Sequence, residues 1–171
     1  MHLVEENQPL DPELGEQFRA HGMVGAAPAM IPMLRQAARA ALVGDATVLI
    51  EGETGTGKQV LAAAIHAMDP KRRMGPLVTV HCGTIPDTLT ESELFGHRRG
   101  AFSGAVAERR GLFAAANRGV IFLDDVNDLP PATQPKLLDV LQRNRIRPVG
   151  SDSEAPVDVR VIAASNRPLQ P

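Results

Sequence analysis

A glycine-rich segment with one lysine lies between an apolar run and a helical pattern, and this arrangement could bind phosphate. The run 46–50 is apolar and β-branched and predicts a buried strand, and apolar residues recur at helical spacing after residue 59. Glycines let successive backbone N–H groups point at one anion, and a helix N-terminus and a lysine add positive charge. A surface turn that happens to contain glycines would need neither the strand nor the helix. The predicted phosphate-binding loop consists of Gly52, Glu53, Thr54, Gly55, Thr56, Gly57, Lys58 and Gln59.

The residue after the lysine departs from the general phosphate-loop pattern. A Ser or Thr at this position usually ligates Mg²⁺ through its hydroxyl. Gln59 offers only an amide oxygen. Either other groups hold the metal, or the ion is bound more loosely.

Polar residues that follow two further apolar runs could complete the site. Asp124 and Asp125 end the run 119–123, which is continuous enough for a strand covered on both faces. Asp124 would hold Mg²⁺, and Asp125 would orient the attacking water; an acidic turn that caps a helix is the alternative. Asn166 follows the run 157–164 and could bind the γ-phosphate or the water, unless it belongs to an ordinary turn before Pro168.

The elements that must position these residues alternate along the chain. The pattern predicts strands at 46–50, 77–80, 119–125 and 157–164. It also predicts a helix at about 28–42, a second one after the phosphate loop that stops at Asp69 and Pro70, a third with Thr90 as N-cap, and a fourth at 131–141. This alternation predicts an α/β fold with a mostly parallel sheet. Because ligands bind beyond the carboxyl ends of such strands, the loop, the two aspartates and Asn166 should converge on one site.

Two further segments stand out by composition. Residues 96–105 contain three glycines around Phe102, so they cannot hold a stable helix and predict a mobile, exposed loop with an apolar tip. The alternative places Phe102 in the core, as for most phenylalanines. The basic run 71–73 is expected to be a solvated surface without a function.

Composition limits the classes of function. A chain of 171 residues with 43% hydrophobic and 22% charged residues is expected to form one globular domain. The net charge of −2 and the absence of Trp and Tyr argue against direct DNA binding. Cys82 is the single cysteine, and no signal peptide or membrane-length apolar run is present, which predicts a cytoplasmic protein without membrane contact. Residues 1–17 are acidic and are expected to form a solvated leader, with the core beginning at Phe18.

Several of these segments together resemble the sigma-54 interaction domain, the AAA+ ATPase module of bacterial enhancer-binding transcription activators. The resemblance covers about residue 18 to the end and implies a phosphate-loop NTPase with a three-layer αβα core. The matching segments are 52–59, 92–97, 100–105, 122–125 and 163–167.

The resemblance also implies ligands and roles. It implies ATP with Mg²⁺, held by the phosphate loop and Val60, with Lys58 and Asp124 as the Walker A and Walker B residues and Asn166 as sensor I. The adenine would pack on Met23, Val24 and Gly25. The loop that resembles the family's GAFTGA motif would touch the sigma-54 RNA polymerase holoenzyme, and AAA+ subunits would assemble into homo- or hetero-oligomers. This loop consists of Gly100, Ala101, Phe102, Ser103, Gly104 and Ala105.

Three positions depart from the family pattern. Ser103 replaces a threonine, Asp125 replaces the Walker B glutamate, and His81 replaces an asparagine that restrains that glutamate. Shortening a catalytic acid by one carbon moves its oxygens by roughly 1 Å, and such a misplacement can cost about 10²-fold in rate. Gln59 is a smaller departure, because glutamate is common at this position in the family.

The resemblance predicts a partial domain, because the family's arginine fingers, last core strand and helical lid follow the sensor asparagine. An arginine finger is worth about 10³ to 10⁵ in rate, so autonomous hydrolysis is expected to be weak or absent. The strand at 46–50 should be an exposed apolar edge that favours self-association. Two functions stay open: an ATP-binding activator module, or a non-hydrolysing regulator that binds complete activators or the holoenzyme. An unrelated phosphate-loop kinase is disfavoured, since no acceptor site is recognisable.

Overall fold

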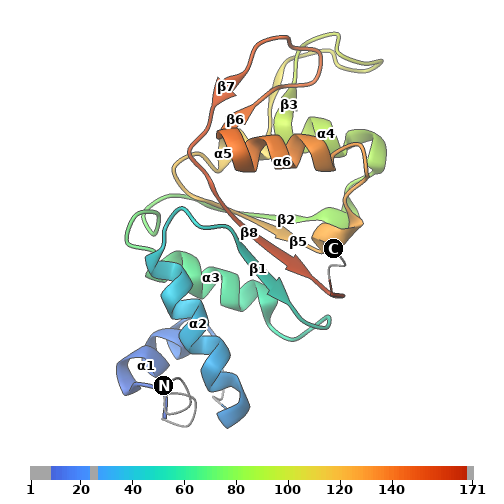
Figure 1. The fold of residues 1–171 in the computed structure, drawn as a ribbon. Helices are drawn as coiled ribbons and strands as arrows, with labels where there is room; N and C mark the ends of the chain where they lie inside the picture. Colours follow the sequence, from blue (N-terminus) through green and yellow to red (C-terminus); the bar gives the residue numbers. More distant parts are fainter. Residues whose placement is uncertain (1–8, 24–26, 169–171) are drawn as a thin grey trace.

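A four-stranded parallel sheet forms the centre of the protein. The structure is a computed structural model that describes residues 9–23 and 27–168. The strand order is β1-β8-β5-β2, and each neighbouring pair is parallel (Figure 1). The strands are β1 (Val48–Glu51), β2 (Leu77–His81), β5 (Val120–Asp124) and β8 (Arg160–Ser165).

Helices cover both faces of this sheet, as the alternating pattern predicts. Figure 1 shows α1, α2 and α3 on one side and α4, α5 and α6 on the other. The first group comprises α1 (Pro12–Ala20), α2 (Ile31–Leu42) after the 3₁₀ turn η1 (Pro28–Met30), and α3 (Lys58–Met68). The second group comprises α4 (Asp87–Phe95), α5 (Leu112–Ala115) and α6 (Gln134–Arg143), with the 3₁₀ turns η2 (Cys82–Thr84) and η3 (Val126–Asp128) near the strand ends. No helix in the described ranges combines the length and the apolar character that a membrane crossing requires.

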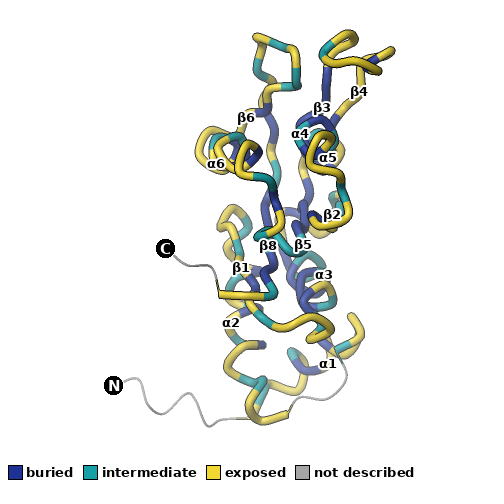
Figure 2. The backbone as a smooth tube through the Cα atoms, turned by 90° about the vertical axis from the view of Figure 1, so that its right-hand side faces the viewer, coloured by how far each residue is buried: buried dark blue, intermediate teal, exposed yellow. Residues whose placement is uncertain are grey.

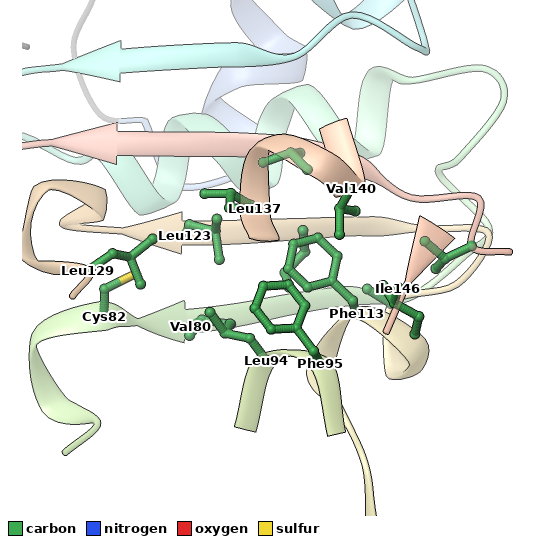
Figure 3. Packing of buried hydrophobic residues seen from close by; sticks show 14 residues of the cluster. Val80, Cys82, Leu94, Phe95, Phe113, Leu123, Leu129, Leu137, Val140 and Ile146 are labelled. Carbon is green, nitrogen blue, oxygen red and sulfur yellow. The ribbon is translucent and has the colours of Figure 1, made fainter. Parts of the chain in front are cut away.

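Strand β5 shows how the sequence builds two cores. Side chains alternate across a strand, so Val120 and Phe122 join the cluster with α2 and α3, while Ile121 and Leu123 join the cluster with α4 and α6. All four are fully buried, and the central strands form the dark, buried part of the tube in Figure 2. The second cluster contains the stacked rings of Phe95 and Phe113 (Figure 3). The α/β fold with a mostly parallel sheet and helices on both faces is thus confirmed.

The N-terminal boundary differs from the expected leader over residues 1–17. Helix α1 already begins at Pro12, and the Asp11 carboxylate accepts hydrogen bonds from the N–H groups of Glu13 and Leu14. Phe18 of this helix is 2% exposed and packs into the core beside α3. An Asp-Pro pair is a strong helix start, so the high acidic content of the leader concealed a capped helix.

Two helix starts also differ from their predicted positions. Helix α4 begins at Asp87, and Thr90 lies inside it as a buried residue whose hydroxyl donates to the Pro86 carbonyl, so Thr90 is not the N-cap. Helix α6 begins at Gln134 rather than at residue 131. Its inward side chains are Leu137 and Val140, because residue i+3 shares a face with residue i.

The basic run 71–73 is not uniformly solvated. Arg72 is 2% exposed and donates to the Gly44 carbonyl and to the carboxylates of Asp45 and Asp158. The prediction of a solvated surface was therefore wrong for Arg72. Its partners lie far away in sequence, and the run itself gives no sign of them.

Two small hairpins project from the sheet on the side of α4 and α6. The first pairs β3 (Gly96–His97) with β4 (Arg109–Arg110), and the second pairs β6 (Arg145–Ile146) with β7 (Ala155–Pro156). Figure 1 shows both beyond these helices. Strands of two residues carry no periodic signal, so the sequence did not predict them.

Candidate functional site

The glycine-rich loop forms an open turn between β1 and α3. Gly55 and Gly57 have φ angles of +83° and +87°, and no atom lies within 4 Å of where a Cβ would be. These left-handed conformations favour glycine, and the empty space leaves room for a ligand against the backbone. Helix α3 begins at Lys58, so the first amide groups of the helix, at residues 58–60, have no partners within it. The turn therefore places backbone N–H donors at a helix start, beside open space.

The Lys58 ammonium group folds back over this loop. Its Nζ donates to the carbonyls of Gly52 at 2.8 Å and Glu53 at 2.9 Å, and the residue is 9% exposed. The Thr56 hydroxyl also donates to the Glu53 carbonyl, at 2.7 Å. Among the described residues, Lys58 is thus held by neutral carbonyl oxygens, and an anion could take their place. Gln59 and Thr54 are exposed.

The two aspartates lie at the end of β5 and have different surroundings. Asp124 Oδ2 lies 3.2 Å from His81 Nδ1 at the end of the neighbouring strand β2. Asp125 adopts a left-handed backbone with φ +52°, and its Oδ1 is buried without a hydrogen-bond partner. Asn166 Oδ1, beyond β8, is also buried and unpaired. Buried oxygens without partners are costly, so each of them has capacity to bind a water molecule or a cation.

Strand order brings these residues to one edge of the sheet. Strand β8 lies between β1 and β5, with Glu51 opposite Ser165 and Leu123 opposite Ala163. The loop, Asn166 and the aspartates therefore follow three adjacent strand ends, which is the convergence that the sequence predicted. The described residues contain no group of three or more His, Cys, Asp or Glu that could hold a metal. A cation here would need oxygens from water or from a phosphate as well, as is common for Mg²⁺.

Ser165 was not among the site residues predicted from the sequence. Its hydroxyl donates to Asn127 Oδ1 at 3.0 Å and so joins the end of β8 to η3. No short-range pattern marks such a bond, since the two residues are 38 positions apart.

The residues expected at the adenine are only partly described. Met23 is partly buried and packs against the core cluster that contains Phe18. A Cβ at the preceding residue, Gly22, would lie 3.9 Å from Val60 Cγ1, so the backbone here runs beside the start of α3. Val24 and Gly25 lie outside the described residues.

Residues 100–105 form a tight loop beyond β3. The Gly100 N–H donates to the Ala105 carbonyl at 2.8 Å, and Ala105 is buried. Phe102 is 38% exposed and packs edge-on against the ring of His97, at a centroid distance of 5.0 Å. His97 is itself buried and shares a 2.7 Å hydrogen bond between its Nδ1 and the Ser92 hydroxyl. Phe102 is thus outside both core clusters, and its ring contacts His97 of β3.

A parallel α/β sheet with a glycine-lysine loop after its first strand defines a phosphate-loop type of domain. The family model of the sigma-54 interaction domain matches residues 23–171, and the chain belongs to this family.

Relatives in curated collections are bacterial transcription regulators. The chain is 46% identical over 158 residues to the transcriptional regulatory protein GlrR of Escherichia coli K12, and 48% identical over 167 residues to the DNA-binding transcriptional activator HyfR of the same strain. These alignments cover 92% and 98% of this chain but only 35% and 25% of the relatives. The chain therefore spans about a third or less of the length of these relatives.

Solved structures of NtrX from Brucella abortus share the fold. The complex of NtrX with ADP superposes with a TM-score of 0.76 at 32% identity, over 91% of this chain and 33% of NtrX. The complex with ATP gives a TM-score of 0.75 at 33% identity, over 90% of this chain and 33% of NtrX.

Proposed function

We propose that this chain is the ATP-binding module of a sigma-54-dependent transcription activator. In this role it couples nucleotide state to contact with the sigma-54 RNA polymerase holoenzyme, through residues 100–105. The observation that carries the proposal is the Lys58 ammonium group, held over an open glycine turn at the start of α3. Likeness to NtrX, solved with ADP and with ATP, supports the choice of nucleotide.

Each part of the site has a proposed task. The backbone of residues 52–60 binds the phosphates, Lys58 turns from the loop carbonyls to the phosphate oxygens, and residues 23–25 pack on the adenine. Asp124 holds Mg²⁺, which would supply positive charge at the phosphates, together with water and phosphate oxygens. Asp125 and Asn166 hold the attacking water.

The proposed partner contact lies far from this edge. Phe102 is a partly exposed aromatic residue on a glycine-flanked loop, and the holoenzyme would bind it together with the rest of residues 100–105. Other AAA+ subunits, identical or different, are the proposed oligomeric partners. Contact with RNA polymerase would place the protein in the cytoplasm.

A second candidate is a non-hydrolysing regulator that binds complete activators or the holoenzyme. The specific observation is that His81 bonds to Asp124, whereas Asp125 has no partner for its buried Oδ1. An acid without a restraining partner is poorly positioned to orient water.

Calorimetry with ATP and Mg²⁺ tests nucleotide binding. Wild type should bind, and Lys58→Ala should lose binding, because the substitution removes the charge at the loop. Arg73→Ala is a matched control, since Arg73 is exposed and makes no described ion pair. The proposal fails if wild type shows no affinity for nucleotide.

Phosphate release separates the two candidates. Turnover that Lys58→Ala abolishes supports the ATPase module, whereas binding without turnover supports the regulator.

Capture of sigma-54 holoenzyme in the presence of a transition-state analogue tests the loop. Phe102→Ala should lose capture, whereas Val106→Ala should keep it, because Val106 is a neighbouring apolar residue, 83% exposed, outside residues 100–105. Equal capture by Phe102→Ala and wild type would refute the assignment of the loop.

A further inference from the structure

A histidine and an aspartate face each other at the ends of β2 and β5. The two strands are parallel neighbours, and His81, the last residue of β2, lies in register with Asp124, the last residue of β5 (Figure 1). His81 Nδ1 lies 3.2 Å from Asp124 Oδ2. The histidine side chain is 52% exposed and the aspartate side chain 20%, so the pair is open to solvent and to a dissolved ion.

Carboxylates outnumber cationic side chains around these strand ends. Within the part of the chain that the structure describes, neither Asp124 nor Asp125 forms an ion pair with a lysine or an arginine. Asp128 of η3 does pair with Arg167, at 3.3 Å. Asp125 Oδ1 is buried without a hydrogen-bond partner. A cation bound here would balance the surplus of negative charge.

The spacing of the two facing atoms fits a single cation. Neighbouring ligands in an octahedron with bonds of about 2.1 Å lie about 3.0 Å apart. The distance between His81 Nδ1 and Asp124 Oδ2 is close to this value, so both side chains can reach one cation. Such a cation would replace the hydrogen bond that the two side chains share.

The other candidate ligands nearby determine the chemistry of the site. The residue after Lys58 is Gln59, so the phosphate loop lacks the hydroxyl that usually ligates Mg²⁺ there. Cys82, next to His81, is 1% exposed and packs in the core, so it is not available to a cation. The accessible set is one imidazole nitrogen, carboxylate oxygens, water and the oxygens of a nucleotide. Oxygens suit Mg²⁺, whereas an imidazole favours first-row transition cations.

We propose that His81 is a ligand of the cation bound with the nucleotide, and that it makes this site prefer a first-row transition cation over Mg²⁺. The inference rests on the nucleotide binding proposed above and adds a ligand and a cation preference to that site. Asp124 supplies an oxygen, His81 supplies a nitrogen, and water and phosphate oxygens complete the coordination.

A histidine that only holds Asp124 in place is the alternative. Such a ring bonds to the carboxylate from outside the ligand shell and does not contact the cation. The open position of His81 and the missing hydroxyl at Gln59 favour direct contact. The two arrangements differ in whether a histidine nitrogen touches the cation, which can be measured.

Electron spin-echo envelope modulation of the complex with Mn²⁺ and ADP tests direct contact. Wild type should show modulation from a directly bound nitrogen, and protein made with ¹⁵N-labelled histidine should show the ¹⁵N pattern, which separates histidine from adenine nitrogens. His81→Asn should lose this signal. His21→Asn is a matched control, because His21 is an exposed histidine at the end of α1, and it should keep the signal. Denaturation curves verify that both variants are folded.

Calorimetry measures the cation preference. The ratio of ADP affinity with Co²⁺ to ADP affinity with Mg²⁺ should be about tenfold or more higher in wild type than in His81→Asn, because only wild type offers the imidazole. Comparing the ratios removes the preference that the nucleotide itself has for one cation. His21→Asn should give the wild-type ratio.

Two results would overturn the inference: ADP and Mn²⁺ bound without a histidine nitrogen signal, or equal affinity ratios in wild type and His81→Asn. Either result would leave the proposed function standing, since nucleotide is still bound, and would make His81 a positioning residue. If ADP binds with none of the three cations, the proposed function is refuted and this inference falls with it.

Discussion

At the residue scale, the thiol of Cys82 is buried close to Asp124 and Asp125 at the end of the sheet. Burial, followed by the nearby charges of Asp124, Asp125 and Asp128, raises the pKa of this thiol to about 12. Only the thiolate attacks disulfide reagents, and the residue is 1% exposed. Labelling of the native protein with a thiol-specific disulfide reagent at neutral pH should therefore be slower than labelling of unfolded chain by orders of magnitude. Equal rates in buffer and in guanidinium would contradict this burial.

A second residue-scale prediction concerns the buried pair of Arg160 and Asp69. Both side chains are 0% exposed, and Arg160 Nη1 donates to Asp69 Oδ2 at 2.8 Å. Arg160 also donates to the carbonyls of Ala40 and Ala46, so it ties β8 to the end of α2 and the start of β1. Arg160→Ala would leave the Asp69 carboxylate buried without a counter-charge, and we expect a loss of about 3–5 kcal/mol in the free energy of unfolding.

Chemical denaturation measures this loss, and Arg73→Ala offers an exposed comparison. The double variant Arg160→Met with Asp69→Asn should recover part of the stability, because it removes both charges from the interior. A loss below about 1 kcal/mol for Arg160→Ala would mean that the pair does not bear on stability as its burial implies.

At the scale of elements, β1 is an edge of the sheet within the described ranges. It pairs with β8 on one side only, and Leu49 is 45% exposed beside a cleft of about 440 Å³ lined by α2, β1 and α3. An apolar strand at the edge of a sheet favours pairing with another chain. This chain should therefore self-associate as its concentration rises, and Leu49→Lys should reduce the association by placing a charge at the edge.

Light scattering after size-exclusion chromatography measures this effect. Leu138→Lys is a matched control, because Leu138 is 53% exposed on α6, away from the edge. Association that is identical in the two variants would exclude the β1 edge as the contact.

The elements that could be predicted from the sequence are those with long periodic or apolar runs. The strand predicted at 119–125 exceeds β5 (Val120–Asp124) by one residue at each end, and the second predicted helix stops where α3 does, just before Asp69, because clear breakers bound both runs. The convergence of the loop with Asp124 followed from chain alternation alone. The prediction that failed concerns a residue whose partners are distant in sequence. Arg72 is buried with ion-pair partners Asp45 and Asp158, which are 27 and 86 residues away along the chain.

At the scale of the whole molecule, a continuous series of contacts joins the phosphate-loop edge to residues 100–105. Asp124 contacts His81 at the end of β2, and the chain then passes through η2 into α4. At the other end of α4, Ser92 bonds to His97, and His97 carries the ring of Phe102. A series of contacts does not by itself show that the two sites are energetically coupled. Coupling has to be measured, with nucleotide added at one site and a signal recorded at the other.

A single fluorescent label can make this measurement, because Cys82 should not react. Ser103→Cys places an accessible thiol in the exposed part of the loop. If a cation and nucleotide draw Asp124 away from His81, the end of β2 and the start of α4 must rearrange, and the label should change its emission on addition of ATP and Mg²⁺. The Lys58→Ala background should abolish the change, and a label at Arg73→Cys, away from the loop, should show none. An unchanged signal at residue 103, in protein that binds nucleotide by calorimetry, would mean that the two ends act independently.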